Sequence, residues 1–355
     1  MRMAKRKLRV GVVGTGAIAR DIHLPNWQEL REEGRIEIVA VCDLIDERAV
    51  GAREKFGAGK SYRSYRKMLR EHDFDIIDVC TQNRWHCPVT IAALEAGANV
   101  LVEKPIAMNA REAMEMARAA KARGRLLMTA QHMRFEPRHE KLKEVVDRGD
   151  LGRIYHASAA CMRRRGIPGW GKFHIQKESR GGPLIDIGVH ILDAVLWITG
   201  FPKPISVSGK VSRMFGDRKD LVNGEWGAPY PLEEFDVEDY ATALIRLAGG
   251  VTLHLEVSWA ANIPDTRAGI SILGDKAGVS TNPLGVYGYE NGALTSTTFD
   301  WLPKQSGHRM EIRHFTECVE NGRPVRVKPE ESVIVQKIID AVYESSKKNR
   351  EVAIR

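Results

Sequence analysis

Short apolar runs alternate with amphipathic stretches over the first third of the chain. The stretches have the apolar spacing of helices, as in Pro88–Ala96 and in Ala110–Arg123, which ends at the helix-stop residue Gly124. The apolar runs have the length of buried strands: Leu8–Val13, Ile36–Cys42, Ile76–Cys80, Val100–Val102 and Leu126–Thr129. This alternation is typical of βαβ units, so it predicts an α/β domain over residues 1–130 with a doubly wound parallel (Rossmann) sheet.

A different pattern begins after Gln131, where short runs that suit strands follow one another without long helices between them. Gly249-Gly250 and Asn291-Gly292 are hairpin signals between such runs. The predicted elements are the helix Pro137–Arg148, the strand Arg153–Arg163, the apolar helix Pro183–Thr199, the strands Ile205–Arg213, Tyr240–Leu247, Val251–Trp259 and Arg267–Gly274, a polar loop at residues 216–236, and the helix Ser332–Ser346.

This order predicts that residues 131–355 form a C-terminal α+β domain with a large open, mostly antiparallel sheet. Two domains agree with a length of 355 residues, because one hydrophobic core stops growing at roughly 250–300. One face of an open sheet needs a cover. A second copy of the chain would supply it, so we expect a homodimer or homotetramer that uses this domain.

Charge and cysteine content narrow the partners and the compartment. The net charge of +8 comes from basic residues spread among nearly as many acidic ones, which favours attraction of an anionic cofactor over nucleic-acid binding. The five cysteines are scattered and form no C-x-x-C pair, so we expect neither disulfides nor a zinc site, and a cytoplasmic location. We find no run of about 18 apolar residues and expect no membrane span.

The first predicted strand runs directly into the glycine turn Gly14-Thr15-Gly16-Ala17-Ile18-Ala19. In a turn of this type Gly14 permits the tight bend, Gly16 lets the backbone approach a pyrophosphate, and Ala19 is small enough for the helix to pack on the strand. The helix N-terminus then faces the phosphates with its partial positive charge. The motif predicts a dinucleotide site, although a plain strand–helix turn would have the same glycines.

Asp43 supports the dinucleotide interpretation. It ends the second predicted strand, 27 residues past Gly16, near the distance at which an acid accepts the ribose hydroxyls. The alternative role is a helix N-cap. A carboxylate here repels the 2′-phosphate of NADP, so we predict NAD as the cofactor, with Arg48 as the one nearby residue that would soften this preference.

Two further groups of residues suit chemistry at a cleft. Lys104 follows the strand Val100–Val102, at the end of a parallel sheet where ligands bind, and Pro105 fixes its turn. Asp186 and His190 are four residues apart on the apolar helix and share a face, which Asp193 extends. Such a polar stripe is expected to face a cleft, and the alternative is an Asp–His pair that satisfies itself in the core.

Together these residues resemble the Gfo/Idh/MocA family of glucose–fructose oxidoreductases and inositol dehydrogenases. The resemblance covers nearly the whole chain and rests on Gly14–Ala19, Asp43, Thr81–His86, Ala96-Gly97, Glu103-Lys104-Pro105 and Asp186–His190. It implies catalytic roles for Lys104, Asp186 and His190. It also implies that Thr81, Asn83, His86, Glu103 and Lys104 hold the cofactor with the glycine turn and Asp43. Gln82 stands where the family often has proline, which leaves the backbone contacts of that loop open.

The chemistry agrees with these roles. Alcohol oxidation removes a hydroxyl proton while hydride leaves carbon, and histidine, whose ordinary pKa is near 6.5, suits the base. Lys104 would stabilise the developing alkoxide, Asp186 would orient the pair or relay the proton, and no metal is required. For the substrate we add Arg164 and Trp170 to these three, although a solvated basic edge and loop packing explain Arg164 and Trp170 as well.

Three residues near these groups are open to two interpretations. His132 and Arg134 follow the last strand of the first domain and are expected near a cleft, or in an interdomain salt bridge. His174 would cap a sugar face or pack within its loop.

We therefore predict an enzyme, an NAD-dependent oxidoreductase that transfers a hydride between nicotinamide and a hydroxyl-bearing carbon of a sugar, inositol or related polyol. The alternatives are a redox-neutral glycosidase that retains NAD, a keto-sugar reductase, and a non-catalytic NAD-binding regulator. The intact set Lys104, Asp186 and His190 argues against the regulator. Substrate specificity lies in loops whose contours the spacing of motifs does not determine.

Overall fold

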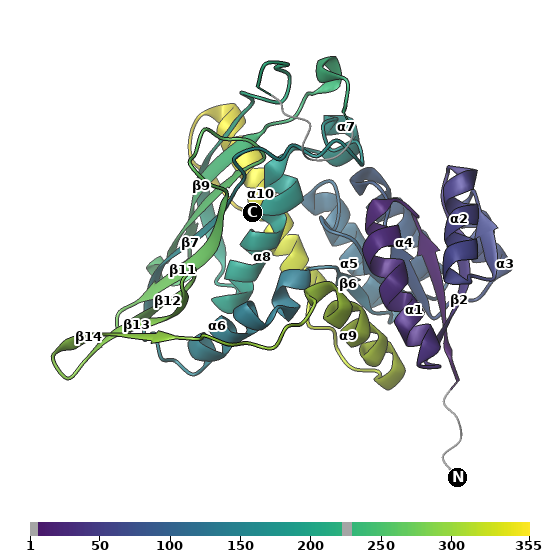
Figure 1. Cartoon of the computed structure of the whole chain (residues 1–355), viewed down its shortest axis with the longest axis horizontal. Coiled ribbons are helices and arrows are strands. Elements are labelled where there is room, and N and C mark those ends of the chain that lie inside the picture. The colour runs from purple at the N-terminus through teal and green to yellow at the C-terminus, as the bar shows by residue number, and fades with distance from the viewer. Residues whose placement is uncertain (1–5, 222–228) are drawn as a thin grey trace, which may run out of the picture. The chain divides into compact units, whose positions relative to one another are not determined.

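A computed structural model describes residues 6–221 and 229–355, and Figure 1 shows the course of the chain. The predicted polar loop at residues 216–236 therefore lies partly outside the described residues. The chain divides into two compact units: the first comprises Met1–Gln131 and Ser306–Val333, and the second comprises His132–Gln305 and Ile334–Arg355. The predicted range 131–355 is thus split, because residues 306–333 pack with the first unit.

The first unit is built on a six-stranded parallel sheet in the order β3-β2-β1-β4-β5-β6. Its strands are β1 (Leu8–Val13), β2 (Ile36–Cys42), β3 (Lys60–Tyr62), β4 (Ile76–Val79), β5 (Asn99–Val102) and β6 (Leu127–Thr129). The helices between them are η1 (Ala19–His23), α1 (Leu24–Glu32), α2 (Asp46–Phe56), α3 (Tyr65–Glu71), η2 (Asn83–Trp85), α4 (His86–Glu95) and α5 (Ala110–Arg123). The strand order reverses between β1 and β4, the point at which such sheets bind ligands.

Local signals explain where the elements of this unit begin and end. All four residues of β4 are buried, as expected for a central parallel strand. Helix α5 begins at Asn109, whose side chain accepts the Glu112 N–H. It ends at Gly124, which adopts the left-handed conformation with φ 59°. The strand β3 was not predicted, since the three residues Lys60–Tyr62 are too few to show the apolar run or alternation that marks a strand.

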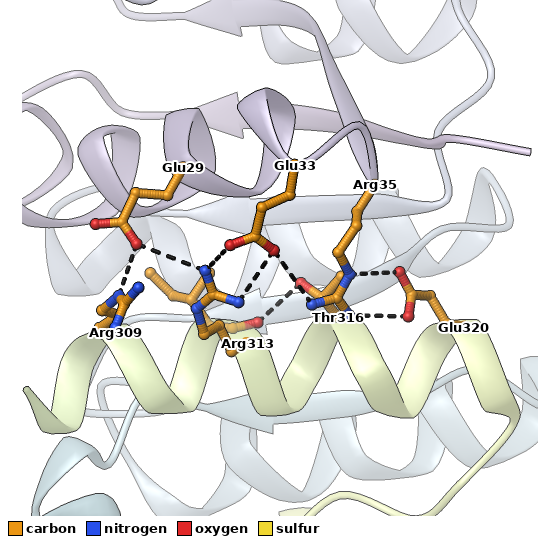
Figure 2. Close-up of polar contacts among 8 residues, drawn as sticks. Glu29, Glu33, Arg35, Arg309, Arg313, Thr316 and Glu320 are labelled. Atoms are coloured by element: carbon orange, nitrogen blue, oxygen red, sulfur yellow. Dashed lines mark hydrogen bonds and ion pairs between the residues drawn. The ribbon is translucent and has the colours of Figure 1, made fainter. Parts of the chain in front are cut away.

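Helix α9 (Gly307–Asn321) returns to the first unit after the second has been traversed. Its inner face buries Glu311, Ile312 and Phe315, each 0% exposed. Figure 2 shows its outer edge, where Arg309 and Arg313 pair with Glu29 and Glu33 at the end of α1, and Glu320 pairs with Arg35. Ion pairs that remain in contact with solvent contribute roughly 0–1 kcal/mol each, so the buried face supplies most of the attachment.

The second unit contains a nine-stranded sheet in the order β14-β13-β12-β11-β7-β10-β9-β8-β15. All neighbours are antiparallel except β7 and β10. The strands are β7 (Ile154–Met162), β8 (Pro204–Ser212), β9 (Tyr240–Leu247), β10 (Thr252–Ser258), β11 (Arg267–Gly274), β12 (Ala277–Thr281), β13 (Leu284–Glu290), β14 (Ala293–Thr298) and β15 (Val352–Ala353). The predicted parallel and mostly antiparallel sheets are both confirmed.

Helices pack on one face of this sheet and form the core of the second unit with it (Figure 1). They include η3 (His132–Phe135), α6 (Pro137–Asp147), η4 (Leu184–Gly188), α8 (Val189–Ile198) and the part of α10 (Pro329–Lys348) that follows Val333, while the short α7 (Gln176–Ser179) lies in the connection between β7 and η4. Short η5 (Leu232–Glu234) and η6 (Ala248–Gly250) lie in connections, and η6 contains the predicted hairpin turn between β9 and β10.

One stretch of the described residues, Gln176–Ile198, is long and apolar enough to cross a membrane. It qualifies by its mean hydropathy and contains Asp186 and Asp193, so it is not a continuous apolar run, and the absence of a membrane span stays a prediction. Because 89% of its apolar window is buried inside the protein, it has the surroundings of a core helix.

Candidate active site

The glycine turn closes against the loop that follows β4. Gly14 has φ 92°, and a Cβ at this position would lie 2.4 Å from the Cys80 carbonyl oxygen, so only glycine fits. At Gly16, by contrast, a Cβ would meet no protein atom within 4 Å among the described residues. Residues from Ala17 are helical. A close approach to the backbone at Gly16 is thus open to a ligand, as a pyrophosphate at a helix N-terminus requires.

Asp43 lies beside this turn. One of its carboxylate oxygens accepts the Thr15 N–H (2.8 Å) and the Thr15 hydroxyl (3.1 Å), and the other accepts the Ile45 N–H (3.0 Å). Helix α2 begins later, with Ile45 at its N-cap, so the alternative role of Asp43 as a helix N-cap is wrong. Asp43 is half-buried, and its carboxylate is hydrogen-bonded to the glycine turn itself through Thr15.

His86 joins the loops that follow β4 and β5. Its fully buried ring lies 3.0 Å from the Thr81 carbonyl oxygen through Nε2 and 2.7 Å from the Pro105 carbonyl oxygen through Nδ1. Burial lowers the pKa of His86, so the ring carries one N–H and donates to one of the two carbonyls. Asn83 is buried in the short helix that precedes His86. Any effect of His86 on a ligand would therefore pass through the two loops that it joins.

The Glu103-Lys104-Pro105 turn contains a cis peptide bond between Lys104 and Pro105. The Glu103 side chain is 5% exposed and bonds into the interior of the unit, where Oε1 lies 2.9 Å from Nε2 of His23. Its other oxygen accepts the backbone N–H of Lys104 at 3.2 Å. Any effect of the Glu103 carboxylate on the cofactor thus passes through the position of Lys104.

In the second unit, Asp186 lies in the π-helical segment η4 and His190 in the helix α8 that continues it. Asp186 is 7% exposed, and its carboxylate accepts the Trp259 indole N–H at 3.0 Å. The ring of His190 meets the edge of His132, with 4.6 Å between ring centroids. His132 in turn lies 3.5 Å from Glu136. A π-helical turn often marks a functional site, since it shifts side chains relative to a regular helix.

Asp193 does not extend this group toward a cleft. It is 0% exposed and forms a bidentate pair with Arg134, also 0% exposed, with two N–O distances of 2.7 Å. Both residues belong to the second unit, so the expected interdomain salt bridge at Arg134 is wrong as well. The Asp193 carboxylate tolerates burial on this apolar helix because Arg134 neutralises it. The position of Asp193 in the helix pattern does not reveal that partner.

The other substrate candidates lie on the loops after β7. Arg164 is exposed, and its guanidinium donates to the Pro264 carbonyl oxygen at 2.8 Å. Trp170 is 39% exposed. His174 is buried and stacks on Tyr230 with 4.8 Å between ring centroids, which is the packing role.

The structure brings the sequence candidates together in two groups. The first unit holds Gly14, Thr15, Gly16, Ala17, Ile18, Asp43, Thr81, Asn83, His86, Glu103 and Lys104 at the carboxyl ends of its central strands, and the second holds Asp186 and His190 on one helix. Sequence reasoning missed His23, Trp259 and Glu238, which support these groups from elsewhere in the chain. Nothing in their local pattern marks them, because their role depends on pairing across the fold.

Comparison with known proteins agrees with this arrangement. Residues 8–131 match an oxidoreductase family with an NAD-binding Rossmann fold, and residues 139–280 match the GFO/IDH/MocA C-terminal domain. The chain is 34% identical over 355 residues to D-glucoside 3-dehydrogenase of Escherichia coli (strain K12), covering 99% of each protein.

Solved structures share the fold over nearly the whole chain. An oxidoreductase domain protein from Kribbella flavida superposes with a TM-score of 0.85 at 23% identity, over 98% of this chain and 99% of that one. GenD2 from gentamicin A biosynthesis, solved with NAD, has a TM-score of 0.79 at 25% identity, over 99% of this chain and 97% of that one.

An NAD-binding Rossmann unit joined to an α+β unit of this kind defines a class of two-domain nicotinamide-dependent oxidoreductases. Within that class, the chain belongs to the Gfo/Idh/MocA family. The family resemblance, the fold class, NAD as the cofactor and the oxidoreductase activity are thereby confirmed.

Proposed function

We propose that this protein oxidises a secondary hydroxyl of a glucoside or a closely related sugar, with Lys104, Asp186 and His190 as catalytic residues. The observation that carries the proposal is the end-to-end likeness, at 34% identity, to a protein named D-glucoside 3-dehydrogenase, in a chain that has the complete lysine, aspartate and histidine set. A pure regulator would have no need of all three.

Each of the three proposed catalytic residues has a separate role in the oxidation. When bound, NAD accepts the hydride that leaves the sugar carbon. Nδ1 of His190 is buried, so Nε2 is the ring nitrogen available to take the hydroxyl proton. The Lys104 ammonium stabilises the negative charge that develops on the hydroxyl oxygen. Asp186, whose carboxylate accepts the Trp259 indole N–H, lies one helical turn before His190 and would stabilise the positive charge of the protonated imidazole. The carbonyl product and one proton remain.

The direct test is a panel of glucosides, free aldoses, inositols and acyclic polyols, with NADH formation as the readout and Lys104→Met as the control for contaminating activity. We expect the highest kcat/KM on a glucoside. Release of free sugar from a glycoside without net NADH would instead establish the redox-neutral glycosidase, and no reaction on the panel in either direction would remove the proposal.

We also propose that the protein is a cytoplasmic homodimer or homotetramer that assembles through the second unit. Large apolar side chains are exposed on its sheet, among them Leu244 on β9, Leu273 on β11 and Leu294 on β14. All five cysteines are free, which suits a reducing compartment. Light scattering that gives a mass near 39.7 kDa at micromolar concentration would contradict the assembly, and cell fractionation tests the location.

A further inference from the structure

Four buried ionisable side chains form a cluster in the first unit, drawn from segments far apart in the chain. They are His23 of η1, Asp78 of β4, Glu103 after β5 and Glu311 of α9, and each is at most 5% exposed. Of these, the family motifs account only for Glu103. Because unpaired buried charges cost several kcal/mol, a cluster of this kind needs a physical reason.

His23 connects two of the carboxylates. Nδ1 lies 2.9 Å from Asp78, which also accepts the Trp27 indole N–H at 2.7 Å, and Nε2 lies 2.9 Å from Glu103. A neutral imidazole has one N–H, so it donates to only one of two ionised carboxylates, whereas the protonated ring donates to both. The geometry therefore favours an imidazolium between two carboxylates.

The charge states agree with this geometry. Burial lowers the pKa of His23, but the charge and hydrogen bond of Asp78 and the contributions of Cys80 together outweigh burial and raise the pKa well above its ordinary value. Burial likewise raises the pKa of Glu103, yet the hydrogen bond and charge of His23, with the charges of Lys104 and His308, bring it down to about 2. His23 and Cys80 also have ligand atoms close to Asp78, but an imidazolium that donates through both nitrogens has no lone pair for a metal.

Glu311 has the opposite character. Within the described residues, neither oxygen of its carboxyl group has a hydrogen-bond partner. Burial raises its pKa well above the ordinary value, and the nearby Glu103 carboxylate raises it further. Both effects favour the protonated, neutral form of Glu311. The cluster thus offers two buried glutamates: Glu103, whose carboxylate is hydrogen-bonded, and Glu311, whose neutral form is favoured and whose oxygens have no hydrogen-bond partner among the described residues.

We propose that His23 and Glu103 are positioning residues for Lys104: the imidazolium of His23 holds the Glu103 carboxylate, whose second oxygen accepts the Lys104 backbone N–H and so sets where the lysine lies. The inference rests on the proposed catalytic role of Lys104. It extends that role to a residue 81 positions earlier in the sequence, at the first helix of the dinucleotide-binding unit.

The first test compares Glu103→Gln with its matched control Glu311→Gln in the full-length protein. Glu103→Gln removes the charge that pairs with His23, and we expect kcat to fall about 10–100-fold, the usual effect of misplacing a reacting group, with KM for the sugar and the NAD dissociation constant changed less than about threefold. Glu311→Gln replaces a neutral carboxyl with a neutral amide of the same shape, and we expect kcat within about twofold of the parent.

The second test uses the two nitrogens of His23 separately. A glutamine amide reaches the place of Nε2 and an asparagine amide that of Nδ1, so His23→Gln retains a donor to Glu103 while His23→Asn retains one only to Asp78. We expect His23→Gln to retain most of kcat and His23→Asn to lose about as much as Glu103→Gln. If His23 has a purely structural role, the two variants will differ in melting temperature but will have the same kcat when both are folded.

A third measurement does not depend on the sugar. Since the Lys104 backbone N–H binds the Glu103 carboxylate, displacement of this turn in Glu103→Gln should change the rate at which Lys104 is acylated, followed by mass spectrometry, while the exposed Lys60 serves as internal control. Equal acylation in all variants, or equal loss of kcat in Glu103→Gln and Glu311→Gln, overturns the inference. If Lys104→Met itself leaves turnover unchanged, the proposed function fails instead, and acylation still reports whether His23 and Glu103 position the lysine.

Discussion

The two units hold their candidate residues in different ways. In the first unit they lie on loops after parallel strands, and side chains from remote segments fix those loops: His86 joins the Thr81 and Pro105 loops, and His23 holds Glu103. In the second unit Asp186 and His190 lie on one continuous helix, so the backbone fixes their spacing. A helix needs support only at its ends and along its buried face. A loop needs it at each functional side chain.

The largest expected effect separates these two kinds of support. His190→Ala should reduce turnover about 10²–10⁴-fold, the usual contribution of a general base, with little change in the NAD dissociation constant, because NAD binding is assigned to the other unit. On one sample, steady-state kinetics measures turnover, calorimetry measures the NAD dissociation constant, and thermal unfolding measures the melting temperature. The exposed His254, also in the second unit, supplies the control variant His254→Ala.

A near-normal rate in folded His190→Ala would remove the catalytic assignment. A lower melting temperature with weaker NAD binding and normal turnover would instead make His190 a structural residue.

The next effect concerns cofactor choice in the first unit. A carboxylate about 4 Å from the 2′-phosphate of NADP repels it by about 4 kcal/mol per unit charge at an effective dielectric near 20. This repulsion would weaken NADP binding about a thousandfold. Asp43→Asn removes this charge while leaving an oxygen for the Thr15 N–H, so we expect the NADP-to-NAD ratio of dissociation constants to fall toward one. Calorimetry measures both constants, with exposed Glu54→Gln as control; an unchanged ratio would show that Asp43 does not select the cofactor.

A buried ion pair supports the helix side of the comparison. Arg134→Met leaves the Asp193 carboxylate buried without its guanidinium partner, and we expect the free energy of unfolding to fall by about 3–5 kcal/mol in urea. Adding Asp193→Asn should recover part of the loss, since it removes the stranded charge. The exposed variant Arg111→Met should cost less than about 1 kcal/mol, and a similar small cost for Arg134→Met would contradict the prediction.

The smallest effect is a pH dependence at the start of the same helix. Burial raises the pKa of Glu238 from 4.5 to about 7, although its carboxylate accepts the Leu184 N–H and the Tyr343 hydroxyl. Between pH 4.5 and 7 the folded state then holds more protons than the unfolded state, so the free energy of unfolding falls as pH rises through this window, by about 3 kcal/mol, and is level above it.

Glu238→Gln should flatten that fall, because an amide does not titrate. Urea unfolding at several pH values measures it, with the exposed Glu233→Gln as control. A slope that persists in Glu238→Gln would assign the pH dependence to another group.

Sequence reasoning reached the parts of the molecule that depend on local pattern. The bounds of β1, β2, α5, β9 and β11 coincide with the predicted ones, since each is a long periodic segment with clear end signals. The Gly14–Ala19 turn and the Lys104 turn were recognised because their spacing is fixed by backbone geometry. Asp193 was assigned to an open stripe, since a helix pattern shows which face a residue shares but not which partner buries it.

Helix α9 was missed for a related reason. Its own pattern is amphipathic, but its place beside α1 depends on pairs such as Arg309 with Glu29, 280 residues apart in the sequence. His23 and Glu311 likewise come together only once η1 and α9 are both in place. Contacts of such separation leave no mark on either segment alone, so the cluster was not predictable from one sequence.

The return of α9 affects how the protein is made. All six strands of the parallel sheet have been synthesised by residue 131, yet the helix that belongs to the same unit begins only after residue 306. At about 5–20 residues per second, a ribosome needs roughly 9–35 s to translate the intervening segment. Through that interval the nascent unit lacks the helix that packs on η1 and α1 and that buries Ile312 and Phe315. A chaperone that binds apolar segments would therefore find its target between these two moments of translation.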